Sequence, residues 1–334
     1  MTAARGPVFC TLLDRFYLPQ GLALLASLDR HVPGMRLWVL ALDERCERLL
    51  AGLGHPGLHL LTLPELETSQ LRQARADRSW GEYCWTLTPF LPEAVLERDR
   101  EASAVTYIDA DCWLAGSVAP LLERFEASGG ACMITPHAYS PQRDKSQSSE
   151  TFCVQFMPFR RGSGSLTILR WWQDRCVERC SGELGQGPLG DQGYLEDWPE
   201  RFGSLVFVCD LPALTLAPWN IERFWGRETV APCLYHFQGF RLFRWANHLV
   251  IRASAGVPLP NSAIAKLHRP YLRDILAMLR RLPAGSLPPK ILPSPTQDLR
   301  GTLLLLPRLL FRSWLVWLRP LPAALRKADG LQHR

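Results

Sequence analysis

The 334-residue sequence has no uninterrupted apolar segment long enough to form a transmembrane helix. Such a helix needs about 20 apolar residues, and the richest segment, residues 301–318, is interrupted by Pro307 and two arginines. A signal peptide is not apparent either, because the apolar run at residues 8–13 is shorter than the apolar core of such a peptide. We therefore expect a cytoplasmic protein.

Closely spaced cysteine motifs are also absent. The ten cysteines are scattered singly, and the near pair Cys176 and Cys180 is one helical turn apart, unlike zinc or redox motifs. We expect reduced thiols, with this pair in the protein core. A composition of 47% hydrophobic and 21% charged residues excludes a disordered chain and a small disulfide-stabilised domain.

Acidic residues are scarce toward the C-terminus. Residues 262–334 contain 13 basic and three acidic side chains, whereas residues 1–261 contain 25 basic and 29 acidic ones. In the second part, prolines interrupt short leucine-rich helical patterns. We therefore expect one large domain over residues 1–261 and a mainly helical, basic extension over residues 262–334.

The first 65 residues alternate strand and helix patterns. Apolar runs at residues 8–13, 37–42 and 58–63 predict buried strands. Leucines at three-residue spacing after Pro19, and the segment 44–53, predict helices between these strands. This alternation is typical of a parallel sheet with crossover helices, so we expect an α/β fold.

Two aspartates follow a later buried strand. Residues 104–108 are rich in β-branched and aromatic side chains, and Asp109-Ala110-Asp111 comes next. Because ligands bind at the carboxyl ends of strands in open α/β sheets, these carboxylates are candidates to hold a divalent cation that bridges phosphate oxygens. The alternative is a solvated turn in which the aspartates cap the strand.

Two further polar residues have both a structural and a functional interpretation. His236 lies within an apolar strand pattern at residues 233–237 and is either a core histidine or, beside the aspartates, a third ligand. Its nitrogen would then favour manganese over magnesium. Asp191 is either the N-cap of a helix or part of the site.

These motifs occur in a specific order along the chain. They are Thr11-Leu12-Leu13-Asp14 with Tyr17, Tyr107-Ile108-Asp109-Ala110-Asp111, Asp191-Gln192 and His236-Phe237-Gln238-Gly239. In this order the chain resembles glycosyltransferases of family 8 and their relatives, over residues 8 to about 244. Residues 82–86 and 152–157 are more similar still to a bacterial subgroup. The resemblance implies a GT-A, Rossmann-like fold for nucleotide-diphospho-sugar transfer.

The resemblance also implies a role for each matching position. Asp109, Asp111 and His236 match the metal ligands. Asp191 and Gln192 match the catalytic pair beside the reacting sugar carbon, and Gln155 lies in a segment that matches another catalytic position. The nucleotide-sugar-binding positions are Thr11, Leu12, Asp14, Tyr17, Trp85, Asp109, Gly239 and Arg241.

Three positions depart from the family pattern. Trp85 replaces an arginine, and Cys153-Val154-Gln155 replaces an Asn-Ala-Gly segment. Leu242 replaces a lysine that steadies the diphosphate, although the neighbouring Arg241 carries the same charge. These departures leave the identity of the sugar and the stereochemical outcome open.

Two features suggest further partners. Trp219 with Asn220 is either a stacking platform for an acceptor sugar or an ordinary core aromatic. Residues 302–327 combine four arginines at helical spacing with apolar side chains, a pattern typical of a helix on an anionic membrane surface or docked on the domain. No nucleic-acid motif accompanies the charge, so we expect no nucleic-acid partner.

The resemblance and the residues lead to one functional expectation. The protein is expected to be a glycosyltransferase that uses Mn²⁺ or Mg²⁺ and transfers a sugar from a nucleotide-diphosphate donor to a glycan or lipid-linked acceptor. Bacterial cell-surface polysaccharide synthesis at the inner face of the membrane is the expected setting. The alternatives are a catalytically silent nucleotide-sugar-binding scaffold and, less favoured, a sugar-nucleotide pyrophosphorylase, because residues 11–16 contain no glycine for a triphosphate loop.

Overall fold

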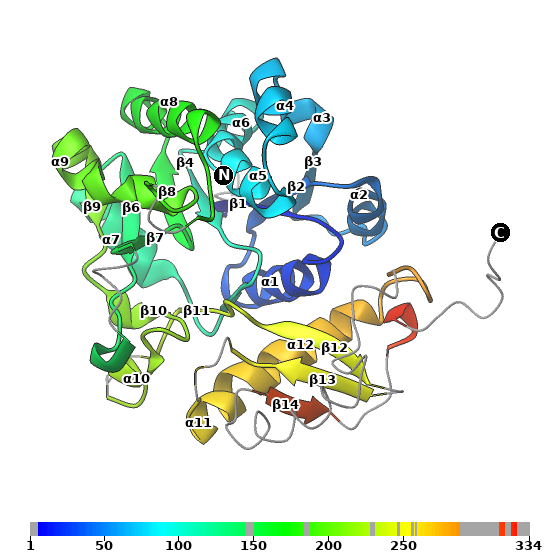
Figure 1. Cartoon of the computed structure of the whole chain (residues 1–334). Coiled ribbons are helices and arrows are strands. Elements are labelled where there is room, and N and C mark those ends of the chain that lie inside the picture. The colour runs from blue at the N-terminus through cyan, green and yellow to red at the C-terminus, as the bar shows by residue number, and fades with distance from the viewer. Residues whose placement is uncertain are drawn as a thin grey trace, which may run out of the picture.

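A computed structural model of the chain describes residues 6–143, 150–183, 187–227, 231–245, 248–254, 257, 259–287, 314–317 and 322–325. Over these residues an eight-stranded sheet forms the centre of the molecule, with strand order β3-β2-β1-β4-β8-β6-β7 and β9 paired with β6. Helices cover both of its faces (Figure 1). The predicted α/β fold is confirmed.

The N-terminal half of the sheet is parallel. Strands β1, β2, β3 and β4 pair in parallel, and β8 and β6 continue the sheet in antiparallel orientation. The strands are β1 (Val8–Leu13), β2 (Arg36–Ala41), β3 (Leu58–Thr62), β4 (Ala104–Ile108), β6 (Cys132–Pro136), β7 (Phe152–Cys153), β8 (Phe156–Arg160) and β9 (Val206–Val208). The strands predicted in the first 65 residues and at 104–108 are therefore present.

Side chains on β1 alternate between two hydrophobic cores. Phe9 and Leu13 belong to the core beneath α1, whereas Val8 and Cys10 belong to the core beneath α5, α6 and α8. A strand buried on both faces accounts for the continuous apolar run in the sequence. All ten cysteines are free, and the predicted core pair is buried.

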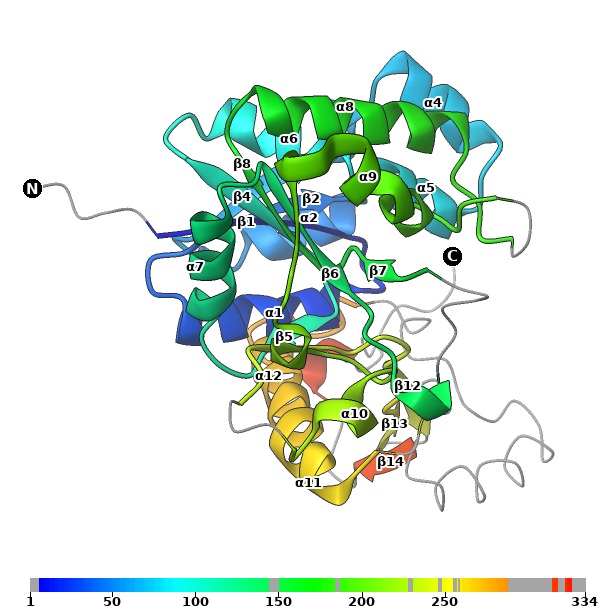
Figure 2. The ribbon, with the colours of Figure 1, turned by 90° about the vertical axis from the view of Figure 1, so that its left-hand side faces the viewer.

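The two helical layers lie on opposite sides of the sheet (Figure 2). One layer contains α4 (Ser69–Ala76), α5 (Trp80–Leu87), α6 (Phe90–Arg98) and α8 (Ser163–Glu178), with the short α3 (Leu63–Leu66) and α9 (Trp198–Phe202). The other contains α1 (Leu18–His31), α2 (Glu44–Ala51) and α7 (Ala119–Ser128), whose buried side chains share one core. No helix in the described ranges is both long and apolar enough to span a membrane.

A small second sheet lies beside the end of β4. It consists of β10 (Thr215–Leu216), β11 (Leu234–His236) and β5 (Cys112–Leu114). Strands β5 and β11 run antiparallel, and His236 is opposite Cys112. The sequence analysis did not predict the three-residue β5, although this strand brings His236 next to Asp111.

The C-terminal part adds a third sheet and a helical segment. Strands β12 (Arg241–Trp245), β13 (His248–Arg252) and β14 (Trp314–Trp317) form an antiparallel sheet. The helices are α10 (Ile221–Phe224), α11 (Asn261–Ala263) and α12 (Arg269–Leu279). The expectation of helix across residues 314–317 is wrong. This Trp-Leu-Val-Trp segment has the aromatic and branched composition that suits a strand, and it pairs with β13.

Helix α12 packs directly on α1. The carboxylate of Asp274 accepts a hydrogen bond of 2.8 Å from Trp113 Nε1 and one of 2.7 Å from Arg30 Nη2. Residues from α12, and Ala324 near the C-terminus, belong to the same core as α1. The domain boundary after Asn261 stays a prediction, and the four tail arginines lie outside the described residues.

Replacement of Asp274 tests the attachment of α12. The substitution Asp274→Ala leaves the indole N–H of the buried Trp113 without its acceptor, whereas the lost ion pair with the half-exposed Arg30 contributes little. We expect the free energy of unfolding, measured by urea denaturation, to fall by about 1–3 kcal/mol. The control Asp174→Ala, at an exposed position of α8, should change it by less than about 0.5 kcal/mol. Equal effects of the two substitutions would contradict this prediction.

Candidate active site

The strand order reverses between β1 and β4. From β1 the chain moves outward to β2 and β3, and it then returns to β4 on the other side of β1. Ligands of open α/β sheets bind where the strand order reverses in this way. Asp14 directly follows β1 and Asp109 directly follows β4, so both carboxylates lie at this edge.

Asp109, Asp111 and His236 form a compact cluster, which we call the acidic triad. Each offers one ligand atom, and these atoms all lie within 4.8 Å of one another. His236 Nε2 is 3.1 Å from Asp111 Oδ1 and 3.7 Å from Asp109 Oδ2. The turn is held by a 2.9 Å bond from Cys112 N to the Asp109 carbonyl, and Phe237 N donates to the Asp111 carbonyl at 2.8 Å.

The charges within the acidic triad depend on one another. Burial opposes protonation of His236, but the carboxylates of Asp111 and Asp109 outweigh it and raise the pKa of the imidazole well above its usual value. Burial also raises the pKa of Asp109, and the charge of Asp111 adds to the effect. The pKa of Asp111 is lowered despite burial, because His236 and Arg241 favour its charged form. Two carboxylates and an imidazole in such close contact suit a divalent cation.

Gln155 orients the histidine of the triad. Its side chain is fully buried, and its Oε1 lies 3.2 Å from His236 Nδ1. This contact favours a proton on Nδ1, so that Nε2 faces the carboxylates and would offer its lone pair to a metal ion bound there. The side-chain Nε2 of Gln155 has no hydrogen-bond partner. Gln155 therefore lies behind the histidine, and its expected catalytic role stays a prediction.

Asp191 is a second buried acid near the triad. Its carbonyl accepts a 2.9 Å hydrogen bond from Trp172 Nε1, and its Oδ2 has no hydrogen-bond partner. Burial raises the pKa of Asp191 to about 7, and the charge of Asp109 contributes. Asp191 precedes a 3₁₀ helix over Gln192–Asp197, but its side chain makes no capping hydrogen bond. The position of this carboxylate favours a site role over the N-cap interpretation.

Gln192 and Trp85 flank Asp191. Gln192 Nε2 donates to Glu150 Oε2 at 3.1 Å. The Trp85 ring, 40% exposed, lies over Gly190, which has a φ of +59°. A Cβ atom at Gly190 would come within 3.2 Å of that ring. The chain therefore needs a glycine here to bring Trp85 and Asp191 together.

Arg241 and Tyr17 lie near Asp111 of the triad. Arg241 Nη2 donates to the Tyr17 hydroxyl at 2.7 Å, and the guanidinium carbon lies 5.0 Å from the Tyr17 ring centre. Gly239 has a φ of +78° in the turn closed by the 2.8 Å bond from Phe240 N to the Phe237 carbonyl. This turn connects His236 to Arg241, and its left-handed conformation favours glycine.

The other predicted positions differ in their burial. Thr11 is fully buried inside β1, and Leu12 is half-buried, so both lie below the edge that Asp14 occupies. Trp219 is half-buried and packs its ring at 5.3 Å from the His236 ring. Asn220 is fully buried and holds the backbone of Ala217 and His137. Its position does not favour the expected acceptor contact.

Trp80 contacts Asp14 at this edge, which the sequence analysis did not predict. Its indole Nε1 donates a 2.9 Å hydrogen bond to Asp14 Oδ2, although the two residues are far apart in sequence. The Ser79-x-x-Glu82 capping box marks Trp80 as the first residue of α5. That local signal predicts a helix start but not the contact with the end of β1.

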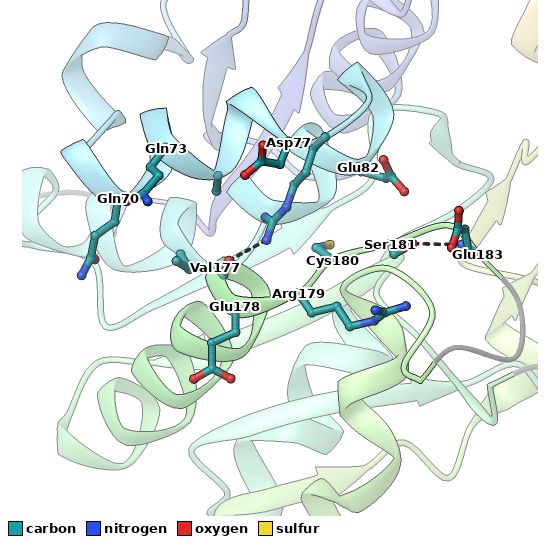
Figure 3. Close-up of a pocket in the computed structure, with 12 residues that line it drawn as sticks. Gln70, Gln73, Asp77, Glu82, Val177, Glu178, Arg179, Cys180, Ser181 and Glu183 are labelled. Atoms are coloured by element: carbon teal, nitrogen blue, oxygen red, sulfur yellow. Dashed lines mark hydrogen bonds between the residues drawn. The ribbon is translucent and has the colours of Figure 1, made fainter.

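A separate polar pocket of about 650 Å³ lies between α4, α5 and the C-terminal end of α8 (Figure 3). Its walls include Asp77, Arg78 and Arg179. None of the three triad residues lines it. A 2.8 Å bond from Gly182 N to Glu82 Oε1 joins its two walls, and the same bond holds the pKa of Glu82 at about 2.

Comparisons with known proteins support the fold. No protein-family model matches the chain. The uncharacterized protein YfnF of Bacillus subtilis is 31% identical over 251 residues, which cover 70% of this chain and 82% of YfnF. The uncharacterized protein YfnD of the same organism is 29% identical over 246 residues, 70% of this chain and 78% of YfnD.

Among solved structures, the galactosyltransferase LgtC, in complex with donor and acceptor sugar analogues, superposes with a TM-score of 0.50. The match covers 81% of this chain and 95% of LgtC at 13% identity. This likeness shows that the chain has the GT-A fold.

The buried carboxylate of Asp191 predicts a pH-dependent stability. The folded protein holds its pKa at about 7, above the ordinary 3.8, so protonation favours the native state and stability falls as the pH rises from about 4 to 7. We expect Asp191→Asn, which removes the charge at constant volume, to raise the free energy of unfolding by a few kcal/mol at pH 8 in the presence of EDTA.

This gain in the free energy of unfolding should nearly vanish near pH 4, where both folded proteins are neutral at this position. Urea denaturation of the two proteins across this pH range measures the difference. A gain that does not depend on pH would contradict the assignment of a raised pKa to Asp191.

Proposed function

Because the chain belongs to the family of the Bacillus subtilis protein YfnF, and because it has the GT-A fold, we propose that it is a metal-dependent glycosyltransferase. It transfers a sugar from a nucleotide-diphosphate donor to a glycan or lipid-linked acceptor. The proposed setting is bacterial cell-surface polysaccharide synthesis in the cytoplasm, at the inner face of the membrane.

The acidic triad is the observation that supports this proposal most strongly. Its three ligand atoms lie within 4.8 Å of one another at the carboxyl ends of the sheet. Oxygen ligands with one imidazole suit Mn²⁺ or Mg²⁺, with the nitrogen in favour of Mn²⁺. A divalent cation at this position would neutralise negative charge on the two phosphates of the donor.

Residues around the triad supply the electrostatics that sugar transfer needs. When the bond between the anomeric carbon and the phosphate oxygen breaks, negative charge grows on the leaving diphosphate and positive charge on the sugar. Arg241, beside Asp111, stabilises the leaving group, and its hydrogen bond to Tyr17 fixes its direction. Asp191 and Gln192 face the sugar side, where an ionised carboxylate favours developing positive charge.

Asp14, Tyr17 and Gly239 are proposed to bind the nucleotide part of the donor. The exposed ring of Trp85 beside Gly190 suits contact with the sugar in place of the arginine found in family 8. Trp219 is the proposed acceptor contact, because it is half-buried and its ring packs against His236.

The two alternative functions, a silent scaffold and a sugar-nucleotide pyrophosphorylase, can be distinguished from a transferase by the nucleotides that the protein releases. A silent scaffold would bind nucleotide sugars without releasing nucleoside diphosphate, whereas a transferase releases it slowly even to water. A sugar-nucleotide pyrophosphorylase would instead consume pyrophosphate and release a nucleoside triphosphate. Incubation with Mn²⁺ and a panel of nucleotide sugars, with and without added pyrophosphate, followed by chromatography of the nucleotides, separates the three.

The substitution Asp111→Asn tests the metal assignment. The side chain keeps its volume but loses its charge, so the fold should be intact while metal-dependent binding is lost. Because loss of a residue that merely orients a metal ligand costs about 10- to 100-fold in affinity, loss of a ligand should weaken Mn²⁺-dependent nucleotide binding by about 100-fold or more. Calorimetric titration measures this, with Asp174→Asn as the control that should bind normally. Unchanged Mn²⁺-dependent affinity in Asp111→Asn would refute the site.

We also propose that the basic residues 302–327 contact an anionic membrane surface. The support is the charge of this part of the sequence, with 13 basic and three acidic side chains over residues 262–334. Deletion of residues 302–327 is a poor test of this contact, because it would also remove Ala324 and Leu325, which are buried in the main core. Substitution of the arginines 308, 312, 319 and 326 by glutamine retains these core residues.

Each basic residue near an anionic surface contributes about 1 kcal/mol, so the fourfold variant should bind anionic vesicles at least about 100-fold more weakly. Sedimentation with vesicles of phosphatidylglycerol, and with neutral phosphatidylcholine vesicles as the control, measures the difference. A variant that sediments as well as the wild type would remove the support for membrane contact.

A further inference from the structure

The carboxylate of Asp14 has little hydrogen-bonding capacity left. Its Oδ1 accepts bonds from Phe16 N at 2.8 Å and Tyr17 N at 3.1 Å, and its Oδ2 accepts the 2.9 Å bond from Trp80 Nε1. A carboxylate has about four acceptor positions. One position, on Oδ2, therefore remains for a ligand, and the indole N–H of Trp80 determines which one it is.

Trp80 is fixed on several sides although its ring is exposed. The capping box of Ser79 and Glu82 anchors its backbone at the start of α5. The Arg75 guanidinium carbon lies 5.5 Å from its ring centre, and the ring of the buried Tyr83 lies 6.1 Å away. Its side chain is nevertheless 38% exposed, whereas most tryptophans are largely buried.

Trp80 is also connected to the acidic triad by a series of contacts. Asp14 binds both Trp80 Nε1 and Tyr17 N, the Tyr17 hydroxyl binds Arg241, and the turn closed by Phe240 N and the Phe237 carbonyl connects Arg241 to His236 of the triad. A nucleotide with its phosphates at Arg241 and the triad can therefore extend its base toward Asp14 and Trp80. Bases commonly stack on exposed aromatic rings of this kind.

From these contacts we propose that Trp80 is a specificity-determining residue for the base of the donor nucleotide. Its indole N–H holds the Asp14 carboxylate so that one acceptor position faces the base, and its ring forms part of the surface on which the base lies. This inference rests on the proposed function, because it requires that a nucleoside diphosphate binds at the triad.

The remaining acceptor position selects a class of base. Uracil and thymine carry an N–H at N3, and guanine carries one at N1, so each donates to a carboxylate oxygen. Cytosine has a lone pair at its N3, which the carboxylate repels. Without the indole N–H, Oδ2 would regain a second acceptor position and the carboxylate could turn, so the discrimination against cytosine should decrease.

The test compares Trp80→Phe with a matched control. Phenylalanine keeps an aromatic ring but removes the N–H. In the control, Trp225→Phe, the same change removes an indole N–H that donates a 2.9 Å bond to Ser262 Oγ, away from Asp14. Calorimetric titration of each protein with UDP, GDP, dTDP and CDP in the presence of Mn²⁺ gives the affinities. Thermal melting shows that both variants are folded.

We expect the wild type to bind one of UDP, GDP and dTDP at least about tenfold more tightly than CDP. Trp80→Phe should lose about tenfold or more of that affinity, because a hydrogen bond to a charged group is lost. Its affinity for CDP should change less, and Trp225→Phe should equal the wild type. If Trp80→Phe does not fold, Asp14→Asn removes the charge that accepts the indole hydrogen bond. It should reduce the ratio between the affinity for the preferred diphosphate and the affinity for CDP.

The outcomes separate the two proposals. If the wild type binds none of the four diphosphates, the proposed function fails and the inference fails with it. If the wild type binds but Trp80→Phe has unchanged affinities, or weakens all four equally, the inference about specificity is overturned while the proposed function stands.

Discussion

The antiparallel pairing of β5 with β11 is the contact on which the candidate site depends. It sets His236 opposite Cys112, one residue after Asp111, and the turn from Asp109 to Cys112 brings the second carboxylate to the same side. The parallel strands β1 and β4 provide the edge, but they cannot supply an imidazole there by themselves. A short ladder thus joins a motif near residue 110 to one near residue 236, and Gln155 holds the resulting imidazole in position.

The same arrangement gathers more negative charge than the protein neutralises alone. The carboxylates of Asp111 and Asp191 are buried and that of Asp109 is half-buried beside them, and the nearby cationic groups are His236 and Arg241. Burial of like charges raises the pKa of a carboxylate, as it does for Asp191. A divalent cation relieves this repulsion and adds an attraction for phosphate oxygens. The repulsion between these carboxylates therefore lowers the stability of the metal-free protein and favours the binding of a divalent cation.

The sequence predicted those parts of the molecule that depend on local pattern. Buried strands with apolar runs and the aspartates that follow β4 were recognisable because burial on both faces leaves a continuous signal. The contact of Trp80 with Asp14 and the three-residue β5 were not, because tertiary packing and not local preference creates them. Residues 314–317 were expected to be helical because arginines recur at helical spacing across residues 302–327, whereas pairing with β13 makes them a strand. Asn220 was expected to join Trp219 in an acceptor platform, but its side chain binds backbone groups inside the core.

A crystal of the protein grown with Mn²⁺ and a nucleoside diphosphate, with diffraction recorded at the manganese absorption edge, tests the central claim most directly. A single anomalous peak in contact with Asp109, Asp111 and His236, with the diphosphate beside it and the base toward Asp14, is the predicted result. Manganese bound elsewhere, or a nucleotide bound without contact to the acidic triad, would contradict the assignment of this site.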